Sequence, residues 1–147
     1  MDISKNDREI SPVGKPNRTN SHRNVRFRVK QDGTWLPEGR SGEKGIFLEA
    51  IAIDMEGNGE YQVCTAKDGW LDPVSGYDIT DRGGYGGHKD SPIIAVRIFS
   101  DQVLYKYGVG ELGGKWHPYA YTNKEGFAGD FGPIDRFLIT KLNGYLK

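Results

Sequence analysis

Apolar and polar side chains alternate along the chain from residue 25 onward, and the alternation comes in three copies. Residues 25–29 have the sequence VRFRV, so the apolar side chains share one face of a predicted strand and the basic ones share the other. Asp32-Gly33 then gives a strong hairpin signal, and Trp35-Leu36-Pro37 follows. A glycine-bearing loop over 39–45 leads into a second apolar segment over 46–53.

The second and third copies repeat this order. A strand around Val63 is followed by a turn, by Trp70 and by a long loop over 74–92, which ends in the β-branched strand 93–98. The third copy begins with a strand over 103–107 and continues through Trp116 and another loop to a strand over 134–139. The predicted copies therefore span about 25–56, 60–100 and 103–141.

A common spacing connects the copies. Trp35, Trp70 and Trp116 are 35 and 46 residues apart, and three of the seven prolines fall at equivalent places beside them. With a period of about 40 residues, one copy cannot bury its own apolar face, so the copies must share a core. We therefore expect an all-β domain over residues 25–147 with three internal repeats in a pseudo-threefold antiparallel arrangement. A β-prism, with one sheet per copy, is favoured over a β-trefoil, and the tryptophans are predicted to lie in the shared core.

Composition favours strands and turns over helices. The 147 residues include 21 Gly and eight Tyr, and no segment places Leu, Ala, Glu and Lys at a helical period. The net charge is zero, but residues 1–30 hold eight Lys or Arg against three Asp or Glu. Residues 1–24 also lack strand or helix periodicity. We interpret residues 1–24 as a polar basic arm or linker.

Cys64 is the only cysteine, which excludes an internal disulfide, and its apolar strand pattern indicates a small buried residue in preference to a nucleophile. The N-terminus has no hydrophobic signal region, and no apolar run reaches the roughly 18 residues that span a membrane. We therefore expect a chain that is synthesised in the cytoplasm without a signal peptide and that has no membrane partner.

The acidic and histidine residues do not predict catalysis. A hydrolase needs paired acids or a nucleophile beside a positioned base, whereas the loop aspartates alternate with glycines. His88 and His117 lack a partner at metal-ligand spacing, and the GGYGG run at 83–87 lacks the Lys-Ser/Thr of a phosphate loop. No catalytic residue, metal or cofactor is therefore predicted. Calcium held by Asp78, Asp81 and Asp90 is the alternative that these loops leave open.

The loop aromatics favour a carbohydrate ligand. A flat ring covers the apolar C–H face of a pyranose, while neighbouring polar groups bind its hydroxyls. Eight loop residues with these properties form the predicted ligand-binding site: Tyr77, Asp78, Asp81, Tyr85, Tyr119, Tyr121, Phe127 and Asp130. Within this set, the stretch from Tyr77 to Tyr85 is predicted to matter most.

Several stretches of the chain also resemble a known family. They are VRFRV at 25–29 with WLPE at 35–38, GWL at 69–71 with VSGYDI at 74–79 and GYGG at 84–87, and GFAGDFG at 126–132 with IDRF at 134–137. Together they resemble the C-terminal cell-wall-binding domain of clostridial N-acetylmuramoyl-L-alanine amidases and related phage endolysins over about residues 25–140. More loosely, LEAIAI at 48–53 looks like the end of a clostridial hydrophobic repeat.

The resemblance implies a module that tethers a lytic enzyme to peptidoglycan or a wall polysaccharide. In that family the amidase and its zinc site lie in a separate N-terminal domain, which has no counterpart here. The first hypothesis is therefore a non-catalytic module that binds bacterial cell-wall glycan and acts at the wall.

The alternative is a phage- or mobile-element-encoded inhibitor or adaptor that binds a protein in the cytoplasm. Its partner would contact the loop aromatics and five basic residues: Lys15, Arg18, Arg23, Arg26 and Arg28. Nucleic acid is the least favoured partner, because the basic arm is the only feature of the sequence that favours it.

Overall fold

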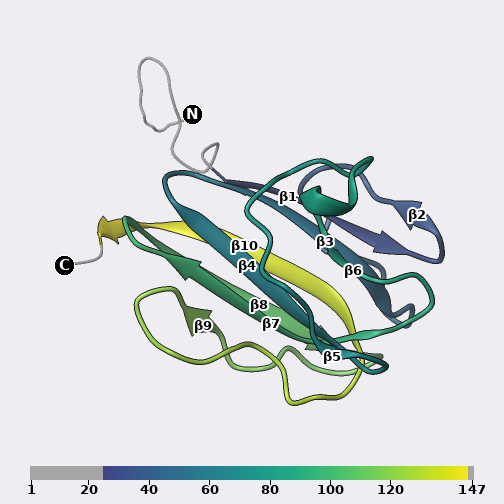
Figure 1. The fold of residues 1–147 in the computed structure, drawn as a ribbon. Helices are drawn as coiled ribbons and strands as arrows, with labels where there is room; N and C mark the ends of the chain where they lie inside the picture. The colour runs from purple at the N-terminus through teal and green to yellow at the C-terminus, as the bar shows by residue number, and fades with distance from the viewer. Residues whose placement is uncertain (1–24, 146–147) are drawn as a thin grey trace.

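A computed structural model describes residues 25–145, which fold into an all-β structure with three small antiparallel sheets (Figure 1). The predicted all-β class is confirmed, and the only helix among these residues is a single 3-10 turn. Residues 1–24, the predicted arm, lie outside the described residues, as do residues 146–147. No helix in the described part of the chain is long and apolar enough to cross a membrane.

Each of the three sheets is built on one pair of long strands. The first sheet contains β1 (Val25–Gln31), β2 (Thr34–Trp35), β3 (Leu48–Met55) and β6 (Gly86–Gly87). The second contains β4 (Gly59–Thr65), β5 (Gly69–Trp70) and β7 (Ile93–Ser100), and the third contains β8 (Val103–Glu111), β9 (Ala120–Tyr121) and β10 (Ile134–Tyr145). The helical turn η2 (Arg82–Gly84) precedes β6.

The long strands pair two by two in chain order. β1 pairs with β3, β4 with β7, and β8 with β10, all antiparallel. In each pair an aromatic residue of the first strand lies opposite an isoleucine of the second, as Phe27 does with Ile53. The short strands β2, β5 and β9 pair with the other edge of β1, β4 and β8, so these three long strands are interior to their sheets.

The core lies between the inner faces of the three sheets. Phe27, Tyr61, Tyr105, Tyr107 and Phe137 provide its aromatic part, together with the β-branched residues of the closing strands. The buried hydroxyls have hydrogen-bond partners, as a core requires. The Tyr61 hydroxyl shares its one proton between the Gly76 and Gly84 carbonyls, and the Tyr107 hydroxyl accepts from the Ile98 amide. Cys64 is buried in β4, which confirms the interpretation of its pattern.

A small residue followed by glycine joins each loop to a strand of another sheet. Gly86-Gly87, which forms β6, pairs with β3 of the first sheet, and Ala128 exchanges two backbone hydrogen bonds with Val96 of β7. In the same way, the amide of Phe137 in β10 donates to the carbonyl of Ser41. The loop of every long hairpin is therefore attached to the closing strand of a different one.

The prediction that the tryptophans lie in the shared core is wrong. Trp35 and Trp70 are half-buried and Trp116 is 38% exposed, and none belongs to the core. The reason is geometric. The tryptophans lie on or beside short edge strands, and their partners Lys30, Cys64 and Gly110 are positions of β1, β4 and β8 outside the core cluster.

Candidate functional site

Each tryptophan lies on the outer face of a sheet beside a cationic side chain. The Lys30 ammonium is 6.0 Å from the ring centroid of Trp35, the Arg97 guanidinium is 4.2 Å from that of Trp70, and the Arg136 guanidinium is 4.9 Å from that of Trp116. These are cation–π distances, and such contacts hold the rings at fixed positions on the surface. Every sheet thus presents a positioned ring to solvent.

Loop aromatics lie against two of these tryptophans. Tyr85 contacts Trp35 edge-on, with ring centroids 5.4 Å apart. Phe127 and Phe131 contact Trp70 at 5.7 and 6.5 Å and contact each other at 4.9 Å. Because Tyr85 and Phe127 directly precede the small-residue–glycine pairs, the backbone anchors that join loop to sheet also place these rings.

The third sheet carries a separate pair of predicted residues. Tyr119 is 42% exposed, and the Lys106 ammonium lies 4.7 Å from its ring centroid. Tyr121 of β9 is also exposed and pairs with Lys106 of β8. These two tyrosines therefore lie on the same sheet as Trp116, and not on the sheet of Tyr77 and Tyr85.

Tyr77 lies over the start of β1 in a group of opposite charges. The Arg26 guanidinium is 5.0 Å from its ring centroid and also binds the carboxylates of Asp54 and Glu38. The Tyr77 hydroxyl donates a 2.7 Å hydrogen bond to Glu38. Partial burial and this bond to a carboxylate raise the pKa of Tyr77 above its usual range, so the phenol stays protonated and acts as a donor.

The predicted aspartates mainly organise their own loops. Asp78 accepts from the hydroxyl and amide of Thr80, and these bonds lower its pKa. Asp81 accepts from the Gly83 amide at the start of η2, and Asp130 accepts from the Gly132 amide. No group of three potential metal ligands occurs among residues 25–145, so the structure gives no support to calcium at Asp78, Asp81 and Asp90.

The eight predicted residues therefore do not form one site. Tyr77 and Tyr85 both lie on the first sheet, but at opposite ends of β1. Tyr77 contacts Arg26 near the start of the strand, whereas Tyr85 contacts Trp35, which pairs with Lys30 near its end. Phe127 lies on the second sheet, and Tyr119 and Tyr121 lie on the third. Of the five predicted rings, Tyr119, Tyr121 and Phe127 are exposed, whereas Tyr77 and Tyr85 are half-buried. Sequence spacing could not show that the loops lie on different sheets.

Of the basic residues of the alternative hypothesis, Lys15, Arg18 and Arg23 lie outside the described residues. Arg26 is engaged by Asp54 and Glu38, and these carboxylates raise its pKa. Arg28 is half-buried, and its Nε donates to the carbonyl of Leu36. Both described arginines thus already have hydrogen-bond partners within the chain.

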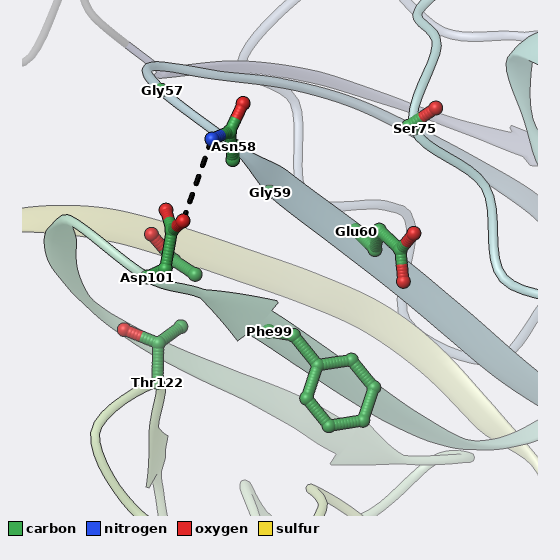
Figure 2. Close-up of a pocket in the computed structure, with 9 residues that line it drawn as sticks. Gly57, Asn58, Gly59, Glu60, Ser75, Phe99, Asp101 and Thr122 are labelled. Atoms are coloured by element: carbon green, nitrogen blue, oxygen red, sulfur yellow. Dashed lines mark hydrogen bonds between the residues drawn. The ribbon is translucent and has the colours of Figure 1, made fainter.

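Two of the surface hollows formed by residues 25–145 bear on the site. One, of about 610 Å³, lies between Trp70, Asp72, Arg82, Tyr85 and His88 and includes part of the predicted stretch from Tyr77 to Tyr85. The other, of about 570 Å³, is lined by Gly57 to Glu60, Ser75, Phe99 to Asp101 and Thr122 (Figure 2). We refer to the second as the Phe99 hollow. Sequence analysis missed it, although the outward-facing positions of Glu60 and Phe99 follow from the strand alternation.

No family model, curated protein or solved structure matches this chain.

Proposed function

We propose that this chain is a non-catalytic carbohydrate-binding module and that its ligand is a bacterial cell-wall glycan. One observation carries the proposal: all three tryptophans lie on the outer faces of the sheets, each held by a neighbouring cation. A ring in that position offers its face to the apolar side of a pyranose. The resemblance to wall-binding domains of lytic enzymes supplies the class of glycan.

We also propose that the three hairpin units are related by a pseudo-threefold axis in a β-prism. Gly42, Gly87 and Gly129 support this arrangement, since all three have a positive φ, between +107° and +129°. Each also packs on the backbone carbonyl of a closing strand, that of Asp135, Glu49 and Ile94 respectively. Three related surfaces would suit a repetitive polymer, because weak sites on one chain multiply through effective concentration.

Sedimentation with purified Gram-positive cell walls tests the proposed function. The chain is expected to pellet with the walls, and Trp116→Ala is expected to reduce the pelleted fraction. Ile46→Ala is the matched control, because Ile46 is 37% exposed, close to the 38% of Trp116, and takes part in none of the ring contacts described above. Failure of the chain to pellet with walls of clostridial and bacillary species at physiological salt would refute the proposal.

A protein-binding adaptor is the second candidate, and the aromatic group around Arg97 favours it. Trp70 stacks on the Arg97 guanidinium and contacts both Phe127 and Phe131, which is the residue chemistry of interface hot spots. This candidate predicts that Phe131→Ala weakens capture of a partner while leaving wall sedimentation unchanged. Deleting residues 1–24 tests the contribution of the arm separately.

A further inference from the structure

The Phe99 hollow lies at one end of the second sheet, between the turns that join this sheet to the first and third sheets. Gly57 and Asn58 come from the turn between β3 and β4, Asp101 from the turn between β7 and β8, and Thr122 from the segment after β9. Glu60 and Phe99 face each other on the paired strands β4 and β7. Strand pairing therefore fixes the floor of the hollow, while the turns form its rim.

An exposed ring provides the apolar surface of the hollow. Phe99 is 47% exposed, although it lies within a strand whose neighbours Ile98 and Ser100 are buried. The Arg97 guanidinium lies 5.7 Å from its ring centroid and is held by Gln62, outside the lining of the hollow. The ring is thus supported by the sheet beneath it and open on the side that faces the hollow (Figure 2).

The polar groups around Phe99 are hydrogen-bond acceptors and neutral donors. Figure 2 shows Asn58 and Asp101 joined across one side of the hollow, and their contact is a long one of 3.4 Å. The side chains of Glu60 and Ser75 have no hydrogen-bond partner among the described residues. The Thr122 hydroxyl, by contrast, already accepts from the Tyr105 amide and donates to the Val103 carbonyl, so Thr122 lines the hollow without a free polar group.

The charges of the lining decide what it can bind. Two carboxylates line the hollow, and no Lys, Arg or His of the described chain does. An anionic group would therefore be repelled, whereas hydroxyls can donate to the carboxylates and an amide carbonyl can accept from Asn58 or Ser75. A volume of about 570 Å³ lies in the range of small-molecule sites.

We infer that the Phe99 hollow is a binding site for an uncharged sugar unit, which stacks on Phe99 and donates hydroxyl hydrogen bonds to Glu60 and Asp101. The inference rests on the proposed function and narrows it. At this site the chain binds a neutral glycan, and it does not bind a phosphate- or carboxylate-bearing wall polymer there.

Titration of the full ¹⁵N-labelled chain by NMR tests the inference. The neutral probes are the β-1,4-linked tetramer of N-acetylglucosamine, cellotetraose and maltotetraose, and the anionic probe is poly(glycerol phosphate). At least one neutral probe is expected to shift the Asn58 side-chain amide and the Gly57 and Gly59 amides, while the anionic probe leaves them unchanged. Concentrations up to about 10 mM suffice, since they exceed about tenfold the level that half-fills a millimolar site.

A pair of variants separates stacking from a general surface effect. Phe99→Ala is expected to weaken binding of the neutral probe at least about fivefold, as the loss of a stacked ring implies. Leu112→Ala is the matched control, because Leu112 is 39% exposed, lies outside the hollow and takes part in none of the ring contacts described above, and binding should stay within about twofold of the parent chain. Both side chains are exposed, and an unchanged amide spectrum elsewhere verifies folding.

The outcomes for the two proposals are distinguishable. If walls pellet the chain but no neutral probe shifts the hollow amides, or if poly(glycerol phosphate) shifts them instead, the inference is overturned and the proposed function stands. Equal weakening by Phe99→Ala and Leu112→Ala also overturns the inference. Failure to pellet with walls refutes the proposed function, while a neutral probe that binds the hollow would still support the sugar site.

Discussion

Substitution of Gly87 by alanine tests the join between the second loop and the first sheet. At this position φ is +129°, and an added Cβ would lie 2.1 Å from the Glu49 carbonyl oxygen and 2.7 Å from the Ala50 Cα. Both neighbours are backbone atoms of β3, so no side-chain rotation can relieve the overlap. The loop must instead move away from the sheet.

The expected loss of stability has two parts. A non-glycine residue in such a backbone conformation costs about 1–3 kcal/mol. Moving the loop away also removes the pairing of Gly86 and Gly87 with β3, at about 1 kcal/mol for each hydrogen bond lost. Gly87→Ala should therefore lower the free energy of unfolding by roughly 3–5 kcal/mol, a large fraction of the stability of an ordinary domain.

Gly69→Ala is the matched control for this experiment. Gly69 also has a positive φ, +75°, but an added Cβ would meet nothing within 4 Å, so only the backbone term of about 1–2 kcal/mol applies. Gly129→Ala should fall between the two, because its Cβ would lie 2.8 Å from the Ile94 carbonyl oxygen.

Urea unfolding followed by tryptophan fluorescence gives the three values. Equal destabilisation by Gly87→Ala and Gly69→Ala would refute the reasoning, since it would mean that the close approach to β3 carries no energy. If Gly87→Ala does not fold, the other two variants still test the reasoning, because Gly129→Ala should lower the free energy of unfolding more than Gly69→Ala does.

Three further predictions concern buried polar groups. Burial acts to raise the pKa of Asp135, but hydrogen bonds from two backbone amides and from the Arg136 guanidinium outweigh it and lower the pKa. The stability that Asp135 contributes is thus present above the pKa of an unfolded aspartate and is lost as pH falls through the lower pKa of the folded state. Asp135→Asn should flatten this acid dependence of the free energy of unfolding. An unchanged pH profile would contradict the prediction. Burial raises the pKa of Tyr61 to about 12, so its contribution to stability is complete below about pH 10 and is lost towards about pH 12. Tyr61→Phe should cost about 1–3 kcal/mol, because the buried Gly84 carbonyl and the partly buried Gly76 carbonyl lose the donor that they share. A loss of stability near zero in urea unfolding would contradict this. Burial also raises the pKa of the Cys64 thiol, so a disulfide reagent should label it far more slowly in the native chain than in urea; equal rates would show that β4 is open.

The difference between prediction and structure is clearest at the aromatic residues. Alternation predicted which strand residues face inward, and Phe27, Val29, Tyr61 and Val63 are buried accordingly. It could not place the tryptophans, because Trp35 and Trp70 lie on two-residue edge strands and Trp116 forms an isolated bridge, so none has alternating neighbours to assign its face. Their outward position follows from pairing with β1 and β4 and, for Trp116, with Gly110 of β8.

The predicted site shows a second limit of prediction from sequence. Tyr85 belongs to the loop of the second hairpin and Trp35 to the first, and only the attachment of β6 to β3 brings their rings together. Nothing in the linear order of residues relates the two, since the contact depends on a loop of one hairpin reaching the closing strand of another. The Phe99 hollow was missed for the same reason, because its lining combines two strands of the second sheet with turns and with Thr122, which follows β9 of the third sheet.

Local sequence is enough to specify the strands and turns of this protein. Period-two alternation and turn residues predict an all-β chain with antiparallel strands and a buried cysteine, because these properties depend on neighbours close in the chain. Which loop lies on which sheet, and which rings remain exposed, depends instead on contacts between residues far apart in the sequence. Gly87 with Glu49 and Gly42 with Asp135 are such contacts, and they form because only glycine allows two backbones to approach so closely.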